Sequence, residues 1–304
     1  MADLNYAEQY GRELAQSYPY VLNFGALYAT PNNGRYRVTG AKTIEIPHLS
    51  TTGRVDADRD HIAEAARNYD NAWEPKVLSH QRTWSTLVHP ADIDQTNQVA
   101  SIANITRVMN EEQKFPEMDA YCVSTLYKEW TELEDADGET IHEADKTELD
   151  TGNVLSVFDA LMLKMDEARV PVNGRILYVT NAVKSMLKQA TGIARNFDVK
   201  TGGSKIDRNI SRIEEVEVIG VPSDLMYTKY DFTSGWKKDP AGKQINMMLV
   251  HPSAVITPVS YQFSTLDTPS ALTSGKYYYY EESFEDVFIL NNHSDAIQFN
   301  IVDP

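Results

Sequence analysis

Apolar and polar residues alternate in two separate stretches of the first hundred residues. Residues 36–48 have the period-two spacing of a strand, and residues 76–88 read as a second strand. The stretch between them, residues 50–74, is polar and rich in Asp, Arg and Asn. The pattern predicts a long two-stranded hairpin with a large tip. Two strands are marginal in water by themselves, so this hairpin needs a surface to lie on.

Helical spacing follows the hairpin. Pro90 suits the first turn of a helix, and the pattern predicts a break at Phe115-Pro116 before a second helix over residues 117–130. The apolar stripe of that second helix is formed at i, i+4 spacing by Met118, Cys122, Leu126 and Trp130. The acidic stretch after Trp130 is expected to be a surface loop or a small hairpin.

A compact α/β pattern begins at residue 151. It predicts helices over residues 154–165 and 183–190, and strands over residues 175–180, 213–221 and 245–250. Gly174 precedes the first of these strands, Thr180 or Asn181 can cap the next helix, and Gly192 suits the position after its end.

The two ends of the chain have different characters. Near the C-terminus, residues 277–290 and 297–301 alternate around an Asn-Asn turn, which predicts an antiparallel hairpin with one buried face. Residues 1–35 hold scattered aromatic side chains broken by proline and glycine, and Asn32-Asn33-Gly34 is a strong turn signal. We expect an arm with one short helix near Ala7–Ser17, whose aromatic side chains need a cover.

Composition indicates a folded chain with its own core. The chain has 304 residues, of which 42% are hydrophobic and 24% charged. The formal net charge is −16 and the Lys and Arg residues are scattered, so direct binding to nucleic acid is not expected. No apolar run is long enough for a membrane span, and the first residues do not read as a signal peptide. The single cysteine, Cys122, excludes an internal disulfide.

The sequence contains no recognisable motif for catalysis or for cofactor binding among the patterns considered below. Residues 202–205 lack the spacing of a phosphate-binding loop, and residues 135–138 fail the calcium-loop pattern because Leu133 and Ala144 would have to be ligands. No two histidines have metalloprotease spacing, and Cys122 lies on an apolar stripe, where a buried thiol is the ordinary outcome. We expect no enzyme activity, no cofactor and no metal.

The order of these parts resembles the major capsid protein of tailed phages, the Hong Kong 97-type fold. The resemblance spans nearly the whole chain and depends on the order and length of the elements. It is carried by the hairpin 36–88, the helix Glu117–Trp130, the GRILYVT strand with the helix NAVKSMLKQA, and NMMLVHPSAV leading to KYYYYEESFEDVFILNN. It implies an α+β fold.

The resemblance also implies a division into domains. Residues 1–35 would form an N-terminal arm, and residues 36–90 an extended hairpin loop that lies across a neighbouring subunit. Residues 91–150 and 255–304 would form a peripheral domain with a long spine helix. Residues 151–254 would form an axial α/β domain that gathers around five-fold and six-fold axes. A neighbouring subunit would cover the arm, the hairpin and part of the acidic surface, since ring-forming contacts join different surfaces of adjacent subunits.

The function that the resemblance implies is structural. Copies of the chain would self-assemble into pentamers and hexamers of an icosahedral or prolate head shell around the phage genome, with the DNA nearby but not specifically bound. Assembly in the host bacterial cytoplasm, a maturing procapsid, a separate scaffolding protein, a portal and a possible decoration protein are the expected context, without a membrane. Lys42 and Lys76 match no cross-linking chemistry, so we expect no cross-link.

Five aromatic residues are the candidate contacts between subunits. Aromatic side chains dominate the energetics of such contacts. The candidates in the arm and the hairpin are Tyr18, Tyr20, Phe24, Trp73 and Trp84. The alternative is that some of them pack within their own subunit.

Two other functions stay open at this point. A cellular nanocompartment shell of the same fold would enclose a cargo enzyme and carry a cargo-peptide pocket inside the shell. An acidic α/β hydrolase or binding module would be a monomer or small oligomer with a deep pocket. A jelly-roll capsid is disfavoured, because the predicted helices over residues 117–130, 152–168 and 181–191 are too many for an all-β sandwich.

Overall fold

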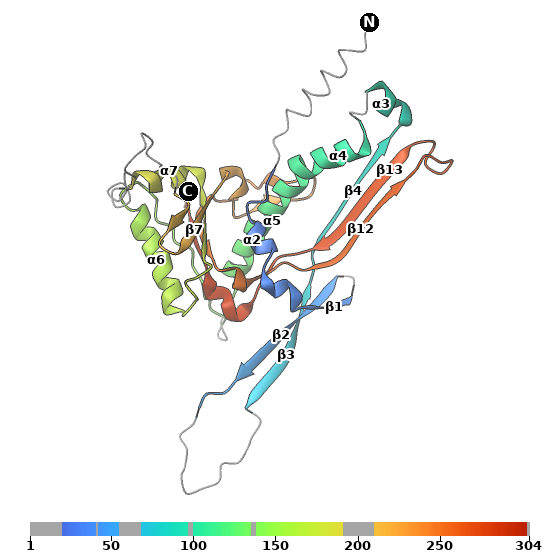
Figure 1. Cartoon of the computed structure of the whole chain (residues 1–304). Helices are drawn as coiled ribbons and strands as arrows, with labels where there is room; N and C mark the ends of the chain where they lie inside the picture. Colours follow the sequence, from blue (N-terminus) through green and yellow to red (C-terminus); the bar gives the residue numbers. More distant parts are fainter. Residues whose placement is uncertain are drawn as a thin grey trace, which may run out of the picture.

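The computed structural model of the chain describes residues 20–40, 42–54, 68–96, 100–134, 138–190 and 210–302. Figure 1 shows an elongated molecule. A compact α/β body lies at one side, and a long helix and a long three-stranded sheet extend from it together in one direction. A hairpin extends in the opposite direction.

A five-stranded sheet forms the centre of the α/β body. Its strand order is β15, β10, β5, β7, β6; β5 and β7 are parallel, and the other neighbouring pairs are antiparallel. The strands are β5 (Ile176–Thr180), β6 (Arg212–Ile213), β7 (Val216–Val221), β10 (Ile245–Val250) and β15 (Ile297–Ile301). All residues of β5 are buried, because helices cover both faces of the sheet.

Three helices cover this sheet. Helices α6 (Val154–Glu167) and α7 (Asn181–Gln189) pack on one face, and the long helix α5 (Phe115–Glu132) packs on the other. The strand predicted over residues 175–180 and the helices predicted over residues 154–165 and 183–190 are confirmed as β5, α6 and α7. Thr180 caps α7 through its hydroxyl, which accepts the N–H of Val183 at 3.4 Å. The predicted end at Gly192 lies outside the described residues.

The long helix is continuous where a break is predicted. Helix α4 (Ile102–Met109) passes through a single π-helical stretch, η2 (Asn110–Lys114), into α5. The predicted break at Phe115-Pro116 is therefore wrong. Proline lacks an N–H and its ring clashes with the carbonyl one α-helical turn earlier. The wider π turn immediately before Pro116 moves that carbonyl away, so the helix absorbs the proline.

The predicted hairpin exists, but its second strand is not the predicted one. Strand β2 (Thr43–Thr51) pairs with β1 (Arg37–Gly40) and with β3 (Tyr69–Val77). Strand β4 (His80–Val88) leaves the hairpin and pairs with β13 (Tyr277–Glu285), which pairs with β12 (Val259–Asp267). The pairing predicted between residues 36–48 and 76–88 is wrong because the chain changes sheet at Leu78-Ser79.

The predicted C-terminal hairpin is also wrong. Strand β13 belongs to the long sheet, and β15 lies beside β10 in the α/β body. Strand β14 (Phe288–Ile289) pairs with β11 (Val255–Ile256). The alternation in β15 misleads because its polar residues, Gln298 and Asn300, are buried too, and the Asn300 amide donates to the carbonyl of Thr147 at 3.0 Å.

Short elements complete the fold. They are α2 (Gly25–Tyr28), η1 (Pro31–Gly34), α3 (Pro90–Gln95), η3 (Ser223–Leu225), β8 (Tyr230–Asp231), β9 (Lys237–Lys238), η4 (Pro252–Ala254) and η5 (Asn291–Ala296). The helix expected from Pro90 begins there as α3, but α3 ends at Gln95, and a separate helix, α4, begins at Ile102, so the expected single helix is wrong. The short arm helix expected near residues 7–17 lies outside the described residues.

Candidate functional site

A group of hydrogen bonds centred on Asp286 holds the joint between the hairpin and the rest of the subunit. Residues Leu78 and Ser79 alone link β3 of the hairpin to β4 of the long sheet. The buried carboxylate of Asp286 accepts hydrogen bonds from the N–H and the hydroxyl of Ser79, at 2.7 and 3.1 Å. It also accepts the Tyr121 hydroxyl at 2.6 Å. One carboxylate therefore ties the link to the long helix.

A small apolar core lies under this link. Three of its side chains come from the hairpin segment, Ile44, Ile46 and Leu78, and three from the rest of the subunit, Ile256, Phe284 and Phe288. Because these six side chains are apart from the two main cores, the root of the hairpin has its own hydrophobic support.

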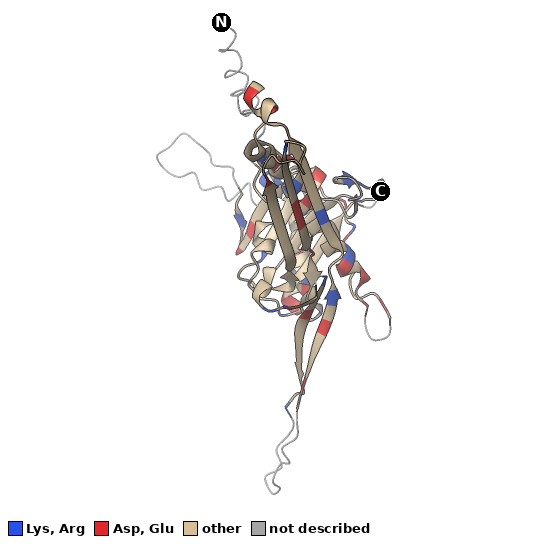
Figure 2. Ribbon diagram, turned by 90° about the vertical axis from the view of Figure 1, so that its right-hand side faces the viewer, with Lys and Arg blue, Asp and Glu red and all other residues tan. Residues whose placement is uncertain are grey.

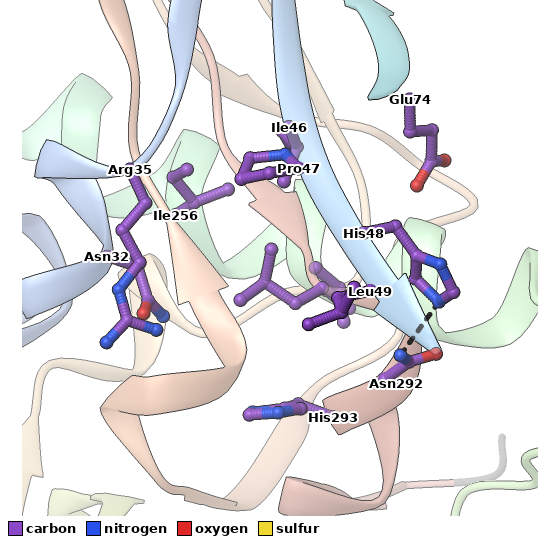
Figure 3. Close-up of a pocket in the computed structure, with 12 residues that line it drawn as sticks. Asn32, Arg35, Ile46, Pro47, His48, Leu49, Glu74, Ile256, Asn292 and His293 are labelled. Atoms are coloured by element: carbon purple, nitrogen blue, oxygen red, sulfur yellow. Dashed lines mark hydrogen bonds between the residues drawn. The ribbon is translucent and has the colours of Figure 1, made fainter. Parts of the chain in front are cut away.

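A cavity of about 160 Å³ lies beside the same root, between β2 and the body (Figure 3). Its apolar lining includes Ile46 and Leu49 from β2 and Ile256 from β11. At its edge the Asn292 amide donates to Nε2 of His48 at 2.9 Å, which links the hairpin to the segment before β15. The hairpin is therefore held on two sides, and the space between them is incompletely filled.

The long helix carries a second buried carboxylate, Asp119, which anchors the start of the described chain. It accepts the Tyr20 hydroxyl and the backbone N–H groups of Asn23 and Phe24, the latter two at 2.9 and 3.2 Å. Burial raises the pKa of Asp119, and these hydrogen bonds oppose the rise. Residues 20–24 are therefore fixed on α5.

Charged side chains join the long sheet to the long helix. Arg82 on β4 pairs with Glu117 at 2.5 Å, and Lys114 pairs with Glu281 on β13 at 3.1 Å. His80 stacks on the ring of Tyr121 at 3.7 Å, and burial lowers the pKa of His80 to about 4, with Arg82 adding to the effect. A neutral His80 fits its place among aromatic rings.

The five candidate contact residues occupy different environments. Tyr18 lies outside the described residues. Tyr20 and Phe24 pack within their own subunit, and Phe24 is fully buried against Tyr178, with ring centroids 4.6 Å apart. Trp73 is exposed on the hairpin, beneath the guanidinium of Arg37. Trp84 is half-buried on β4 against Tyr279. Of the four candidates that the structure describes, Tyr20 and Phe24 lie together at Asp119, and Trp73 and Trp84 lie on different sheets.

Sequence reasoning missed Asp119 and Asp286 as structural centres. Asp286 does interrupt the apolar alternation of residues 277–290, and Asp119 lies one residue after Met118 of the predicted apolar stripe. A carboxylate inside an apolar pattern is the signal that could have marked both, because a buried charge needs dedicated partners.

The described residues contain no group of three or more His, Cys, Asp or Glu side chains that could hold a metal ion. None of the helices described is long and apolar enough to cross a membrane. Cys122 is fully buried, and burial raises the pKa of its thiol, which disfavours the reactive thiolate.

Comparison with known proteins was made for both sequence and structure. No protein-family model matches the sequence, and no curated protein sequence matches it. The fold, in contrast, matches solved structures along most of the chain.

Three of these structures are capsids of phages. The capsid of cyanophage P-SCSP1u matches with a TM-score of 0.64 at 10% identity, over 95% of this chain and 90% of that one. The mature capsid of bacteriophage PhiM1 matches with 0.62 at 12% identity, over 86% and 82%. The capsid of Myoviridae phage XM1 matches with 0.51 at 10% identity, over 96% and 98%. The chain therefore has the α+β fold of tailed-phage major capsid proteins, the Hong Kong 97-type fold.

Proposed function

We propose that this protein is the structural subunit of a phage head shell, which assembles with copies of itself into hexamers and pentamers. One observation carries the proposal: the fold matches a cyanophage capsid chain over 95% of this chain and 90% of that one. A match of that extent supports a role that the chain performs as a whole, like that of the capsid chain. Proteins of this fold act through the surfaces they present to copies of themselves.

The parts of the subunit can be assigned roles on this proposal. The hairpin β1–β2–β3 is the extended loop, and the helix α4–α5 with the sheet β12–β13–β4 is the peripheral domain. The five-stranded sheet with α6 and α7 is the axial domain. On this proposal residues 297–301 are assigned to the axial domain rather than to the peripheral domain, because their strand β15 pairs with β10 in this sheet.

Further partners belong to the same proposal. A separate scaffolding protein would guide curvature, a portal would occupy one vertex, and a decoration protein would add to the outer surface. The shell would assemble in the host cytoplasm and enclose DNA without specific binding, in keeping with a net charge of −16. Trp73 and Trp84 stay candidate contacts, because both have exposed or half-exposed rings on parts that extend from the body.

Negative-stain electron microscopy of the purified protein tests the proposal. The chain is expressed alone and then together with the neighbouring genes of its phage. Closed shells, tubes or capsomer rings are expected under at least one condition. Uniform small particles under both conditions would refute self-assembly as the function. A nanocompartment would instead co-purify with one cargo enzyme, which the same preparation reveals.

A further inference from the structure

The cavity at the root of the hairpin has an apolar floor. Its volume is about 160 Å³, and three buried isoleucines from three different strands form the floor: Ile46 of β2, Ile256 of β11 and Ile289 of β14. In another protein, a cavity of about 150 Å³ lined by Leu, Ile and Phe binds benzene. The floor therefore has space for one benzene-sized apolar group.

Hydrogen bonds hold the two sides of this cavity in place. On one side the buried amide of Asn32 donates to the carbonyl oxygens of Ser253 and Val255, at 2.7 and 3.2 Å. On the other side the Asn292 amide donates to Nε2 of His48 at 2.9 Å (Figure 3). A site whose walls are already fixed loses less conformational entropy when a ligand binds.

The mouth of the cavity carries two polar side chains that have no partner. Arg35 and His293 both line the cavity and are exposed to solvent. Within the described part of the chain, no hydrogen bond or ion pair reaches the guanidinium of Arg35 or the ring of His293. Figure 3 shows both side chains around Leu49, with Arg35 at the left and His293 below. Two donors are therefore available beside the apolar floor.

The unpaired guanidinium stands out in an acidic chain. The formal net charge is −16, and Figure 2 shows Lys and Arg residues interspersed with Asp and Glu. Arg37, Arg82 and Arg175 each pair with a carboxylate, at Glu45, Glu117 and Asp166. Arg35 is left to pair with an anion from outside the described chain, and a guanidinium holds a carboxylate through two parallel N–H···O bonds.

One more lining residue limits the charge of that anion. Glu74 also lines the cavity, and its carboxylate lies 3.0 Å from the ammonium group of Lys76. A dianion such as a phosphate monoester would be repelled by Glu74 more strongly than a monoanion. The chemistry of the mouth therefore fits a single carboxylate.

We propose that this cavity is a binding site for a small monocarboxylate that carries one benzene-sized apolar group. The apolar group lies on Ile46, Ile256 and Ile289, and the carboxylate accepts hydrogen bonds from Arg35 and His293. Residues of one subunit form the whole site, so the inference does not depend on the proposed shell function. Because β2 belongs to the hairpin and β11 and β14 do not, a bound molecule contacts the hairpin and the rest of the subunit at once.

Equilibrium dialysis with ¹⁴C-labelled phenylacetate tests the binding. The full-length purified chain is used in whatever assembled state it adopts, and saturable binding of one molecule per chain is expected. Phenylacetamide has nearly the same shape without the charge and is expected to compete at least tenfold more weakly. Acetate has the charge without the ring and is expected not to compete at the same concentration.

Substitution of Arg35 tests where the carboxylate binds. Arg35→Gln is expected to weaken phenylacetate binding at least tenfold and to leave phenylacetamide binding within twofold of the parent chain. Arg37→Gln is the matched control, because Arg37 is also exposed, two residues further along the chain, and lies outside the lining of the cavity. It is expected to bind phenylacetate within twofold of the parent chain.

A second variant tests the same site through the hairpin. Leu49→Asp places a negative charge at the mouth and is expected to abolish saturable phenylacetate binding. Ser50→Asp places that charge on the next residue of β2, which is exposed and outside the lining, and is expected to have less than a twofold effect. Thermal unfolding checks that every variant is folded.

Three results would overturn the proposed site. They are a lack of saturable phenylacetate binding to the parent chain, competition by phenylacetamide as strong as by phenylacetate, and unchanged phenylacetate binding in Arg35→Gln or Leu49→Asp. Particle assembly is measured separately, so each of these results leaves the shell function standing.

Discussion

The carboxylate of Asp286 holds Ser79 through two hydrogen bonds, to its N–H at 2.7 Å and to its hydroxyl at 3.1 Å, across 207 residues of sequence. Ser79 stands where the chain passes from the hairpin to the long sheet. Asp286 accepts Tyr121 of the long helix as well. Asp286 therefore contributes to the direction in which the hairpin leaves the subunit, together with the small apolar core at its root.

Removing that side chain is expected to destabilise the subunit. Asp286→Ala leaves the Ser79 N–H and the Tyr121 hydroxyl without their acceptor, and each such loss costs about 1–3 kcal/mol. We expect a loss of about 2–4 kcal/mol in the free energy of unfolding, measured by denaturant titration. Asp286→Asn keeps one acceptor oxygen and is expected to lose less. Asp267→Asn, at an exposed position on β12, serves as the control; an equal loss there would contradict the assignment.

The anchor of the arm gives a second prediction. Asp119→Ala removes the acceptor for Tyr20 and for two backbone N–H groups, at Asn23 and Phe24. Limited proteolysis is expected to cut residues 20–28 at least tenfold faster in this variant. Tyr20→Phe removes a single hydrogen bond, worth about 1 kcal/mol, and is expected to show a smaller increase. Unchanged cleavage in Asp119→Ala would show that packing of Phe24 alone holds the segment.

Trp84 gives a prediction about assembly. Its ring packs on Tyr279, with centroids 5.7 Å apart, and is only half-buried in the isolated subunit. Trp84→Ala is expected to cost the subunit about 1–2 kcal/mol, below the 3–5 kcal/mol of a fully buried tryptophan. The yield of assembled particles, measured by sedimentation, is expected to fall more than the lower folding stability of the subunit alone would cause. An unchanged yield would remove Trp84 from the contact residues, and Trp84→Phe is the conservative control.

The pH dependence of stability should contain a component from Glu129. The pKa of Glu129 is raised from 4.5 to about 7, chiefly by burial; the N–H of Ile289 and Lys76 oppose this rise, and the carboxylates of Asp286 and Glu132 add to it. Between about pH 4.5 and pH 7 the folded chain then binds more protons than the unfolded chain. Stability from this group is therefore lost as pH rises through that window.

Glu129→Gln is the matching test. Glutamine is neutral at every pH and keeps an oxygen that can accept the N–H of Ile289. The difference in melting temperature between pH 5 and pH 8 is expected to change by several degrees relative to the parent chain. His80, whose pKa is lowered to about 4, contributes in the opposite direction between about pH 4 and 6.5. It is present in both chains and cancels in the comparison; identical pH profiles would refute a raised Glu129 pKa.

Local patterns predict the α/β body well and the long-range pairings poorly. Strand β5 and helix α7 are predicted because an apolar run, Thr180 as cap and helical spacing all lie within fifteen residues. Residues 76–88 look like one strand because nothing near Leu78-Ser79 marks the change of sheet. The partner that enforces it, Asp286, is distant in sequence.

The candidate contacts show the same limit. Phe24 and Trp73 are both aromatic residues in segments without an obvious core. Phe24 is buried because Tyr178, in a different element, lies beside it, and Trp73 is exposed because its hairpin leaves the body. The sequence shows which segments contain aromatic residues of the kind found in interfaces. Only the three-dimensional arrangement shows which of those aromatic side chains are exposed on the subunit surface.

Strand β15 imposes an order on the synthesis of the protein. Residues 297–301 form the outer strand beside β10, and Phe299 packs on Trp130 of the long helix, with ring centroids 5.1 Å apart. The ribosome must therefore translate through residue 301 before this core can close. A nascent chain that ends earlier leaves the edge of β10 unpaired and leaves the Trp130 ring without Phe299, although His142 still stacks on that ring. A prematurely terminated chain therefore cannot complete the α/β body, and only full-length chains can supply folded subunits to a particle.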